Sequence, residues 1–132
     1  MPRFFCDRDV LKLARWLRFA GFDVMTRQEL SEAKVAYICQ KDRRVFITRN
    51  KKTRKHTTRV EILSSDDVKE QLRYILTKYK MDEDKIASRC MECNVLLRQV
   101  VDDEEKKYCP RCGKYFWKGS HYESMVSVIR LQ

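Results

Sequence analysis

Four cysteines in the last third of the chain constrain its fold more than any other feature. They follow the pattern Cys90-x2-Cys93-x15-Cys109-x2-Cys112. Two thiolates on one tight turn can bind one metal ion, and a second such turn completes a tetrahedral site. The N-terminus has no signal-peptide pattern, and in an intracellular chain this spacing indicates metal ligation and not disulfides. We therefore predict a structural zinc ion bound by all four cysteines, with no position open for catalysis.

The remainder of the chain alternates between short apolar runs and amphipathic segments. Strands that alternate with helices predict a parallel sheet with right-handed crossovers. The other two cysteines, Cys6 and Cys39, lie in apolar stretches and are expected to be core residues. We expect Ser31, Asp67 with Glu70, and Ser120 to cap helices. The strand candidates are residues 3–7, 22–26, 44–48 and 59–63, and the helix candidates are residues 8–20, 31–40, 67–80 and a last segment from Ser120.

A charged linker, "KMDEDK", indicates the domain organisation. We predict an α/β domain over residues 1–85. Residues 86–132 are predicted to hold the cysteine module, from about 88 to 118, together with the C-terminal helix.

The net charge of +10 is concentrated in one segment. Residues 41–60 hold nine Lys or Arg and one acid, Asp42. Most charge runs are solvated loops, but such a patch is also typical of phosphate-binding proteins. No apolar run approaches the ~18–20 residues that span a bilayer, and no amphipathic helix accompanies the patch. We therefore expect a soluble, intracellular protein that does not bind membranes.

Polar residues follow the predicted strands. In a parallel α/β sheet the working site lies at the carboxyl ends of the strands. Asp7 and Asn50 occupy two such ends, and Glu32 begins the second helix. A carboxylate at position 50 would indicate a metal-dependent nuclease, whereas an asparagine can instead cap the loop by binding backbone N–H groups.

Aromatic residues alternate with lysines after the last cysteine, in "KYFWK". Such a cluster can stack bases and pair with phosphates. It can equally form the hydrophobic seat on which a small zinc ribbon docks, which is the commoner role. We expect His121 to be a packing residue and not a fifth metal ligand.

The sequence resembles a known family, the mut-seven C-terminal RNase domain. The resemblance covers nearly the whole chain and depends on motifs in the family's order: "FFCD", "LARWLRFAGFDV", "RVFITRN", "QL" at 71–72, "SRCMECNVLL" and "CPRCGKYFWKGSHY". It implies a PIN-like fold followed by a zinc ribbon. The family occurs alone in prokaryotes and at the C-terminus of certain animal 3′–5′ exoribonucleases.

The resemblance also implies roles for residues near the strand ends. Asp7 matches a metal ligand of PIN-like folds, and Glu32 matches the family's acidic position. Asn50 stands where the family usually has Asp, and Arg8 stands where a small residue is usual. Hydrolysis of this type needs clustered carboxylates to hold Mg²⁺ or Mn²⁺. The two departures indicate a site partly converted from cutting RNA to holding it.

The leading hypothesis is a single-stranded RNA-binding accessory domain of a 3′–5′ exoribonuclease in RNA silencing. By itself the domain is expected to be weak or inactive as a nuclease. Its partners would be RNA and the exonuclease domain of the same protein, in the cytoplasm, RNA granules or the nucleus. Trp16 and Phe19 are additional candidates for stacking on bases. The predicted RNA contacts are Arg8, Lys12, Arg15, Arg49, Lys51, Lys52, Arg54, Lys55, Arg59, Lys114, Tyr115 and Lys118.

Two alternatives remain open at this point. The first is a metal-dependent endoribonuclease that uses Asp7 and Glu32, with Asp9 or Asp42 in place of the missing carboxylate. The second is a docking module that localises a larger enzyme through a protein partner, which would bind the loop at 50–58.

Overall fold

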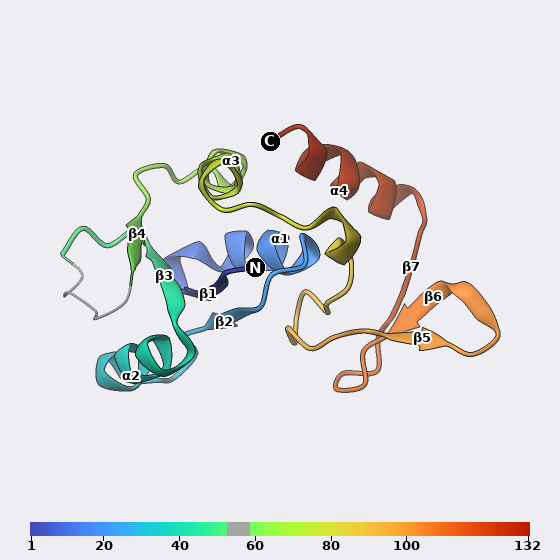
Figure 1. Ribbon diagram of the computed structural model, residues 1–132, viewed down its shortest axis with the longest axis horizontal. Coiled ribbons are helices and arrows are strands. Elements are labelled where there is room, and N and C mark those ends of the chain that lie inside the picture. Colours follow the sequence, from blue (N-terminus) through green and yellow to red (C-terminus); the bar gives the residue numbers. More distant parts are fainter. Residues whose placement is uncertain (53–58) are drawn as a thin grey trace.

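The computed structural model describes residues 1–52 and 59–132. A four-stranded parallel sheet, in the order β2-β1-β3-β4, forms the first part of the molecule (Figure 1). This confirms the predicted α/β class. The strands are β1 (Arg3–Cys6), β2 (Val24–Thr26), β3 (Arg44–Thr48) and β4 (Val60–Ile62).

Helices cover both faces of this sheet (Figure 1). One face packs on α2, and the other packs on α1, α3 and α4. Both faces are apolar because side chains alternate along each strand: Phe4 and Cys6 lie on one side of the sheet and Phe5 on the other. The helices are η1 (Arg8–Val10), α1 (Leu11–Phe19), α2 (Glu32–Asp42), α3 (Val68–Lys78), η2 (Glu83–Lys85) and α4 (Ser120–Arg130), of which η1 and η2 are 3₁₀ helices.

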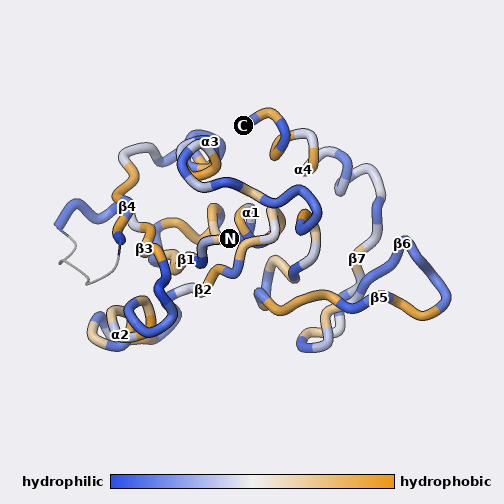
Figure 2. The backbone as a smooth tube through the Cα atoms, in the orientation of Figure 1, coloured by the Kyte–Doolittle hydropathy of each residue, from blue (hydrophilic) through white to orange (hydrophobic). Residues whose placement is uncertain are grey.

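The core has a large and a small part. The large part joins the sheet to α1, α3 and α4, and the small part consists of Phe5, Val35, Cys39 and Phe46. Cys6 and Cys39 are fully buried, which confirms their predicted place in the core. Burial raises the pKa of Cys39 to about 11 and that of Cys6 further, so both thiols are neutral. Figure 2 shows the hydrophobic residues of β1 and β3 at the centre of this part of the molecule.

The cysteine module contains a second, antiparallel sheet in the order β5-β6-β7. Its strands are β5 (Arg98–Val100), β6 (Asp103–Tyr108) and β7 (Tyr115–Trp117). After β7 the chain returns to the first part of the molecule (Figure 1), and Met125, Val126 and Ile129 of α4 lie in the large core. The C-terminal helix therefore packs with α1 and α3, although it follows the ribbon in sequence.

Local hydrogen bonds explain where the helices begin. Ser31 caps α2 by accepting a bond from the Lys34 N–H at 3.2 Å, as predicted. Asp67 caps α3 through the Lys69 N–H at 3.2 Å, but Glu70 binds the Ser65 hydroxyl and does not complete a capping box. The prediction for Ser120 is wrong, because Gly119 holds the cap position of α4 and no side chain caps that helix.

One residue of α1 differs from its predicted role. Phe19 was a candidate for stacking on a base, which needs an exposed ring, and this prediction is wrong. Phe19 is buried and makes edge contacts with the rings of Trp16 and Tyr122, at 6.5 and 5.9 Å between centroids. Arg18 is buried as well. The reason is that the cysteine module and α4 cover this side of α1.

Candidate functional site

Asp7 lies at the carboxyl end of β1, beside the end of β3. The two strands are parallel neighbours, so Asp7 and Thr48 meet at one edge of the sheet. Asp7 is buried. Its Oδ2 accepts a hydrogen bond from the Thr48 hydroxyl at 2.9 Å, and its Oδ1 accepts one from the Arg8 N–H at 2.9 Å. The Arg27 guanidinium lies 3.5 Å from the same Oδ1. Protein donors therefore occupy both carboxylate oxygens.

Asp9 and Asn50 adjoin this pair and are engaged with the backbone. Asp9 accepts a hydrogen bond from the Arg49 N–H, and Asn50 donates its own N–H to the Thr48 hydroxyl at 3.1 Å. The Asn50 Oδ1 accepts from the Lys52 N–H at 3.0 Å. This is an Asx turn, the capping role that we had considered for Asn50.

The remaining carboxylates do not complete a metal site of the nuclease type. Glu32 is an exposed residue in the first turn of α2. Within residues 1–52 and 59–132, the four cysteines are the single set of three or more Cys, His, Asp or Glu whose ligand atoms gather closely. Asp42 cannot replace the missing carboxylate, because it precedes the amino end of β3 and binds Arg44 there at 3.1 Å. The expectation that Asp42 could serve as a substitute ligand is therefore wrong.

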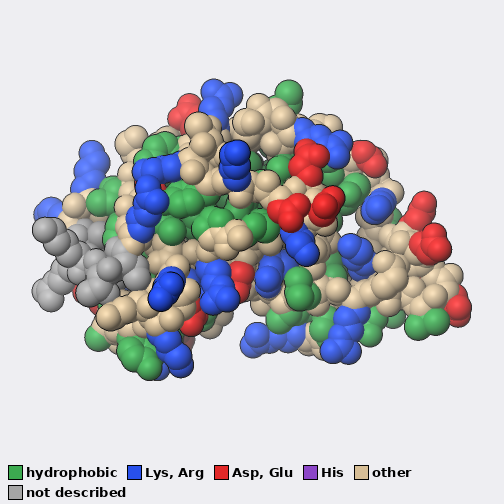
Figure 3. All heavy atoms as spheres, viewed as in Figure 1, with side chains coloured by type: hydrophobic (Ala, Val, Ile, Leu, Met, Phe, Trp, Pro, Cys, Tyr) green, Lys and Arg blue, Asp and Glu red, His purple; other side chains and the backbone are tan. Residues whose placement is uncertain are grey.

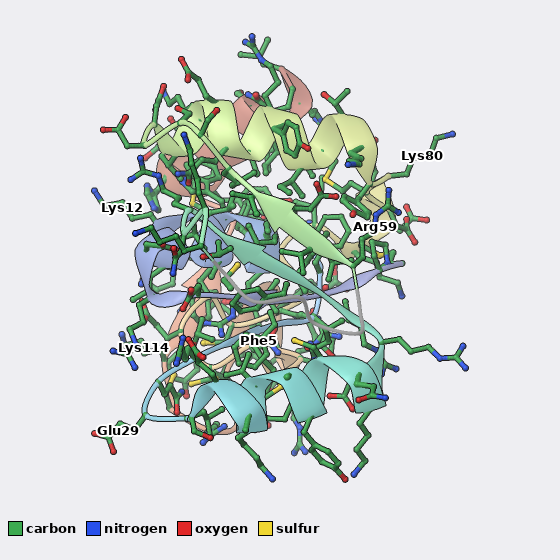
Figure 4. The ribbon with its side chains drawn as sticks, turned by 90° about the vertical axis from the view of Figure 1, so that its left-hand side faces the viewer. Phe5, Lys12, Glu29, Arg59, Lys80 and Lys114 are labelled. Atoms are coloured by element: carbon green, nitrogen blue, oxygen red, sulfur yellow. The ribbon has the colours of Figure 1, made fainter. Side chains whose placement is uncertain are left out.

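The basic run of residues 41–60 is divided between the two edges of the sheet. Arg44 is buried at the amino edge, where it pairs with Asp23 and Asp42. Hydrogen bonds from Arg44 and Asn94 outweigh the burial of Asp23 and hold the pKa of its carboxyl below the usual range. Arg59 directly precedes β4 on the side opposite Lys12 (Figure 4), and its guanidinium lies over the Tyr79 ring.

Exposed cations collect at the carboxyl edge near Asp7. Arg8, Arg49, Lys51 and Lys52 are all exposed there, and Arg27 is half-buried. In Figure 4, Lys12 and Glu29 lie on this side of the molecule, with Lys114 of the cysteine module on the same side. Arg15 pairs with Glu92. Two predicted RNA contacts, Arg54 and Lys55, lie outside the described residues. On the cysteine module, the predicted RNA contacts Lys114, Tyr115 and Lys118 are exposed.

Acidic side chains gather elsewhere. Figure 3 shows them near the segment after α3 and at the β5–β6 hairpin, whereas basic side chains are spread over the rest of this face. Glu83, Asp84, Glu104 and Glu105 line one hollow there, together with Lys107, Lys118 and Arg130. Acidic and basic side chains therefore meet in this hollow.

The four cysteines form a compact cluster. Their sulfur atoms all lie within 4.8 Å of one another, and the Sγ atoms of Cys90 and Cys112 are 3.9 Å apart. A tetrahedral zinc with Zn–S bonds of about 2.3 Å needs sulfurs about 3.8 Å apart, so the cluster fits such an ion. The four residues can therefore hold one metal ion.

Both cysteine turns have the same backbone design. The residue after the second cysteine is left-handed in each turn, with φ of 69° at Asn94 and 77° at Gly113. Each donates its N–H to the carbonyl of the first cysteine, at 2.8 and 2.9 Å. Asn and Gly tolerate this conformation better than other residues.

Backbone donors also favour thiolates in the second turn. The N–H groups of Arg111 and Cys112 lie 3.4 Å from the Cys109 sulfur. Burial opposes ionisation, but these hydrogen bonds outweigh it and hold the pKa of Cys109 at about 7. For Cys93, burial and the neighbouring sulfurs raise the pKa to about 12. A bound metal ion offsets the free-energy cost of ionising this thiol, because metal-bound thiols are deprotonated.

The first cysteine turn is attached to the sheet by two residues that sequence reasoning missed. Arg18 donates to the carbonyls of Val24 at 2.9 Å and Met91 at 2.8 Å. Asn94 accepts from the Val24 N–H at 2.9 Å and donates to Asp23 at 2.8 Å. The turn position of Asn94 was predictable from the sequence, because Asn94 directly follows the first cysteine pair as Gly113 follows the second.

A cavity of about 280 Å³ lies where the cysteine module meets α1 and α4. Aromatic side chains supply much of its wall. The aromatic residues are Phe19, Tyr115, Phe116, Trp117 and Tyr122.

No helix in the described part of the chain is long and apolar enough to cross a membrane.

Comparison with known proteins identifies one matching family. No curated protein and no solved structure matched the chain. The family model described as the Mut7-C RNAse domain matches residues 2–129, nearly the whole length, as the motifs had indicated. The chain therefore belongs to the Mut7-C RNAse domain family.

Proposed function

We propose that this chain is a single-stranded RNA-binding accessory domain of a 3′–5′ exoribonuclease. The proposal rests on the contacts of the Asp7 carboxylate. Its carboxylate is engaged by Thr48, Arg8 and Arg27, while exposed cations surround it. Such an edge attracts phosphate more strongly than a divalent metal ion.

The same geometry argues against efficient hydrolysis by the isolated domain. Metal-dependent cleavage uses carboxylates to hold Mg²⁺ or Mn²⁺ and to activate water. Here the Asp9 carboxylate binds the Arg49 backbone and the Asn50 oxygen binds the Lys52 backbone. A metal ion would have to displace these donors.

We assign the four-cysteine cluster to Zn²⁺. Four sulfur ligands at tetrahedral spacing suit zinc, and they leave no position for water. The ion would supply folding free energy to a module that has little apolar core of its own.

The exonuclease context and a role in RNA silencing rest on the family resemblance. In that setting the domain would present RNA to an exonuclease domain of the same protein. A localising protein partner at the loop after β3 is the alternative that a pull-down experiment would address.

The direct test is the salt dependence of RNA binding. Contact with about five or six phosphates predicts a slope of log K against log salt of roughly −4, at about −0.7 per contact. Replacing Arg8, Lys51 and Lys52 by Gln removes three exposed cations at the carboxyl edge. We expect weaker binding and a slope shallower by about 2.

The matched control removes the same charge at other places. Lys41 lies in the last turn of α2, Lys80 follows α3, and Lys85 ends η2, and all three are exposed. Their replacement by Gln should leave the slope nearly unchanged. Equal effects of the two triple variants would show that RNA does not bind at the carboxyl edge.

An endoribonuclease is the second candidate. It is favoured by the match to an RNAse domain family and by the presence of Asp7 and Asp9 at the strand ends. Brisk cleavage of RNA by the wild-type domain with Mn²⁺, abolished by Asp7→Ala, would establish this candidate in place of the first.

A further inference from the structure

The aromatic cavity beside α4 has no role in the contacts described so far. It is open to solvent on one side and is bounded by β7, by the start of α4 and by α1. Phe19 and Tyr122, which both line it, pack against each other. We had considered such a packing role for the aromatic cluster of residues 114–118, to which neither ring belongs.

Tyr115 and Trp117 are different, because their side chains remain 60% and 61% exposed. Residues two apart on a strand face the same side, so both rings lie on one face of β7. The Trp117 indole also lies close to the Gly119 backbone. A Cβ atom on Gly119 would lie 3.3 Å from two indole atoms, so glycine leaves room for the ring. Trp117 thus presents an exposed indole beside the cavity.

Basic side chains of one neighbouring hollow favour an anionic ligand, whereas the hollow with Glu83, Asp84, Glu104 and Glu105 also shares Trp117 with this cavity. A second hollow, lined by Lys12, Arg15 and Trp16, shares Met91, His121 and Met125 with the cavity. Lys114 and Lys118 flank β7. No side chain caps α4, whose first residues line the cavity, although Glu123 lies in its first turn.

We propose that this cavity binds one nucleobase of the RNA strand, stacked on Trp117. This rests on the proposed RNA-binding function and extends it from the carboxyl edge of the sheet to the zinc module. An aromatic ring matches the apolar walls, and the phosphates on either side of the base match Lys12 and Arg15, of which Arg15 would exchange its partner Glu92 for a phosphate. Those two residues follow Arg8 on η1 and α1, so a bound strand would run along this side of α1 from the carboxyl edge to the cavity.

The test compares two RNA chains on two proteins. One chain is a short oligouridylate, and the other is a ribose-phosphate chain of equal length that lacks bases. Both carry the same phosphates, so their difference measures base contacts alone. We expect loss of the bases to weaken binding to the wild type at least about fivefold, the lower end of measured base–aromatic stacking. Binding to Trp117→Ala should depend much less on the bases.

Two further variants separate stacking from folding. Trp117→Phe keeps a flat ring and should retain most of the dependence on bases. Tyr37→Ala removes an equally exposed aromatic residue from α2 and should behave as the wild type. The metal content of every variant should match that of the wild type.

Each result bears on one proposal or both. If the wild type binds both chains equally, with the expected salt slope, the base pocket is wrong and RNA binding at the carboxyl edge stands. If Trp117→Ala responds to the bases as strongly as the wild type, the base lies elsewhere. If neither chain binds the wild type, the proposed function fails together with the pocket.

Discussion

Asn50 carries two roles that a substitution can separate. Its Oδ1 caps the loop by accepting from the Lys52 N–H, and its own N–H reaches the Thr48 hydroxyl that binds Asp7. Asp can form the same cap and adds a full negative charge beside Asp7 and Asp9. The cap and the charge can therefore be tested independently.

We predict that Asn50→Asp raises the affinity for Mn²⁺, because a further carboxylate near Asp7 and Asp9 attracts a divalent cation. Stability should change by less than about 0.5 kcal/mol, since the cap remains. Titration calorimetry measures the affinity, and Asn50→Ala is the control that loses the cap without adding charge. Unchanged Mn²⁺ binding in the Asp variant would leave Asn50 with the cap alone. Return of RNA cleavage is not required, because Arg8 and Arg27 still adjoin the site.

At the scale of elements, a buried carboxylate fixes the short edge strand β4 against α3. Glu61 accepts hydrogen bonds from Tyr74 at 3.0 Å, from Lys78 at 3.0 Å and from Tyr79. Burial disfavours its charge, but these donors outweigh burial and hold the pKa of Glu61 below its ordinary value of 4.5. The ionised form therefore stabilises the folded state.

We predict that this stabilisation is present above about pH 4.5 and is lost as the pH falls through the lowered pKa of folded Glu61, because the unfolded chain takes up the proton first. Glu61→Gln should lower the free energy of unfolding near neutral pH by about 1–3 kcal/mol. It should also flatten the acid side of the stability curve, measured by urea unfolding. Asp66→Asn, at an exposed position on the same connection, should do neither. An unchanged acid limb in Glu61→Gln would assign the acid sensitivity to other carboxylates.

At the scale of the whole molecule, the cysteine module and the α/β core depend on each other. Arg18 and Asn94 attach the first cysteine turn to the sheet, and the Ala87 N–H binds the Phe19 carbonyl at 2.7 Å. Gly21 allows close approach to the segment before the module, since a Cβ there would lie 2.6 Å from the Lys85 backbone. Beyond the module, α4 returns to the core.

We predict one zinc ion per chain, and that Cys109→Ser or a chelator unfolds the module. Because α4 is connected to the sheet through the module, hydrogen exchange should also rise in α4 and in the part of α1 that it covers. Elemental analysis and exchange mass spectrometry measure both effects. Cys39→Ser removes a buried thiol that lies outside the cluster and should keep the full metal content. Folded protein purified without chelator and free of zinc would contradict the assignment.

Local patterns in the sequence were sufficient for the elements and for the metal ligands. Alternating apolar runs and helical periodicity predicted the four parallel strands and the helices, because both signals repeat over a few residues. The spacing of the cysteine pairs predicted their convergence, since each pair lies on one short turn. Asp7 and Asn50 were placed at one edge because parallel strands end together.

Long-range contacts decided what the sequence pattern could not. The burial of Arg18 and Phe19 depends on the return of α4 and the docking of the module, which are distant in sequence. The basic run of residues 41–60 is contiguous in the chain, yet β3 separates Arg44 at the amino edge of the sheet from Arg49 at the carboxyl edge, and Arg44 is buried between two aspartates. Charge and hydropathy along a chain determine which segments fold together. The partner of each side chain is determined by tertiary packing, because it requires the positions of residues that only the folded chain brings into contact.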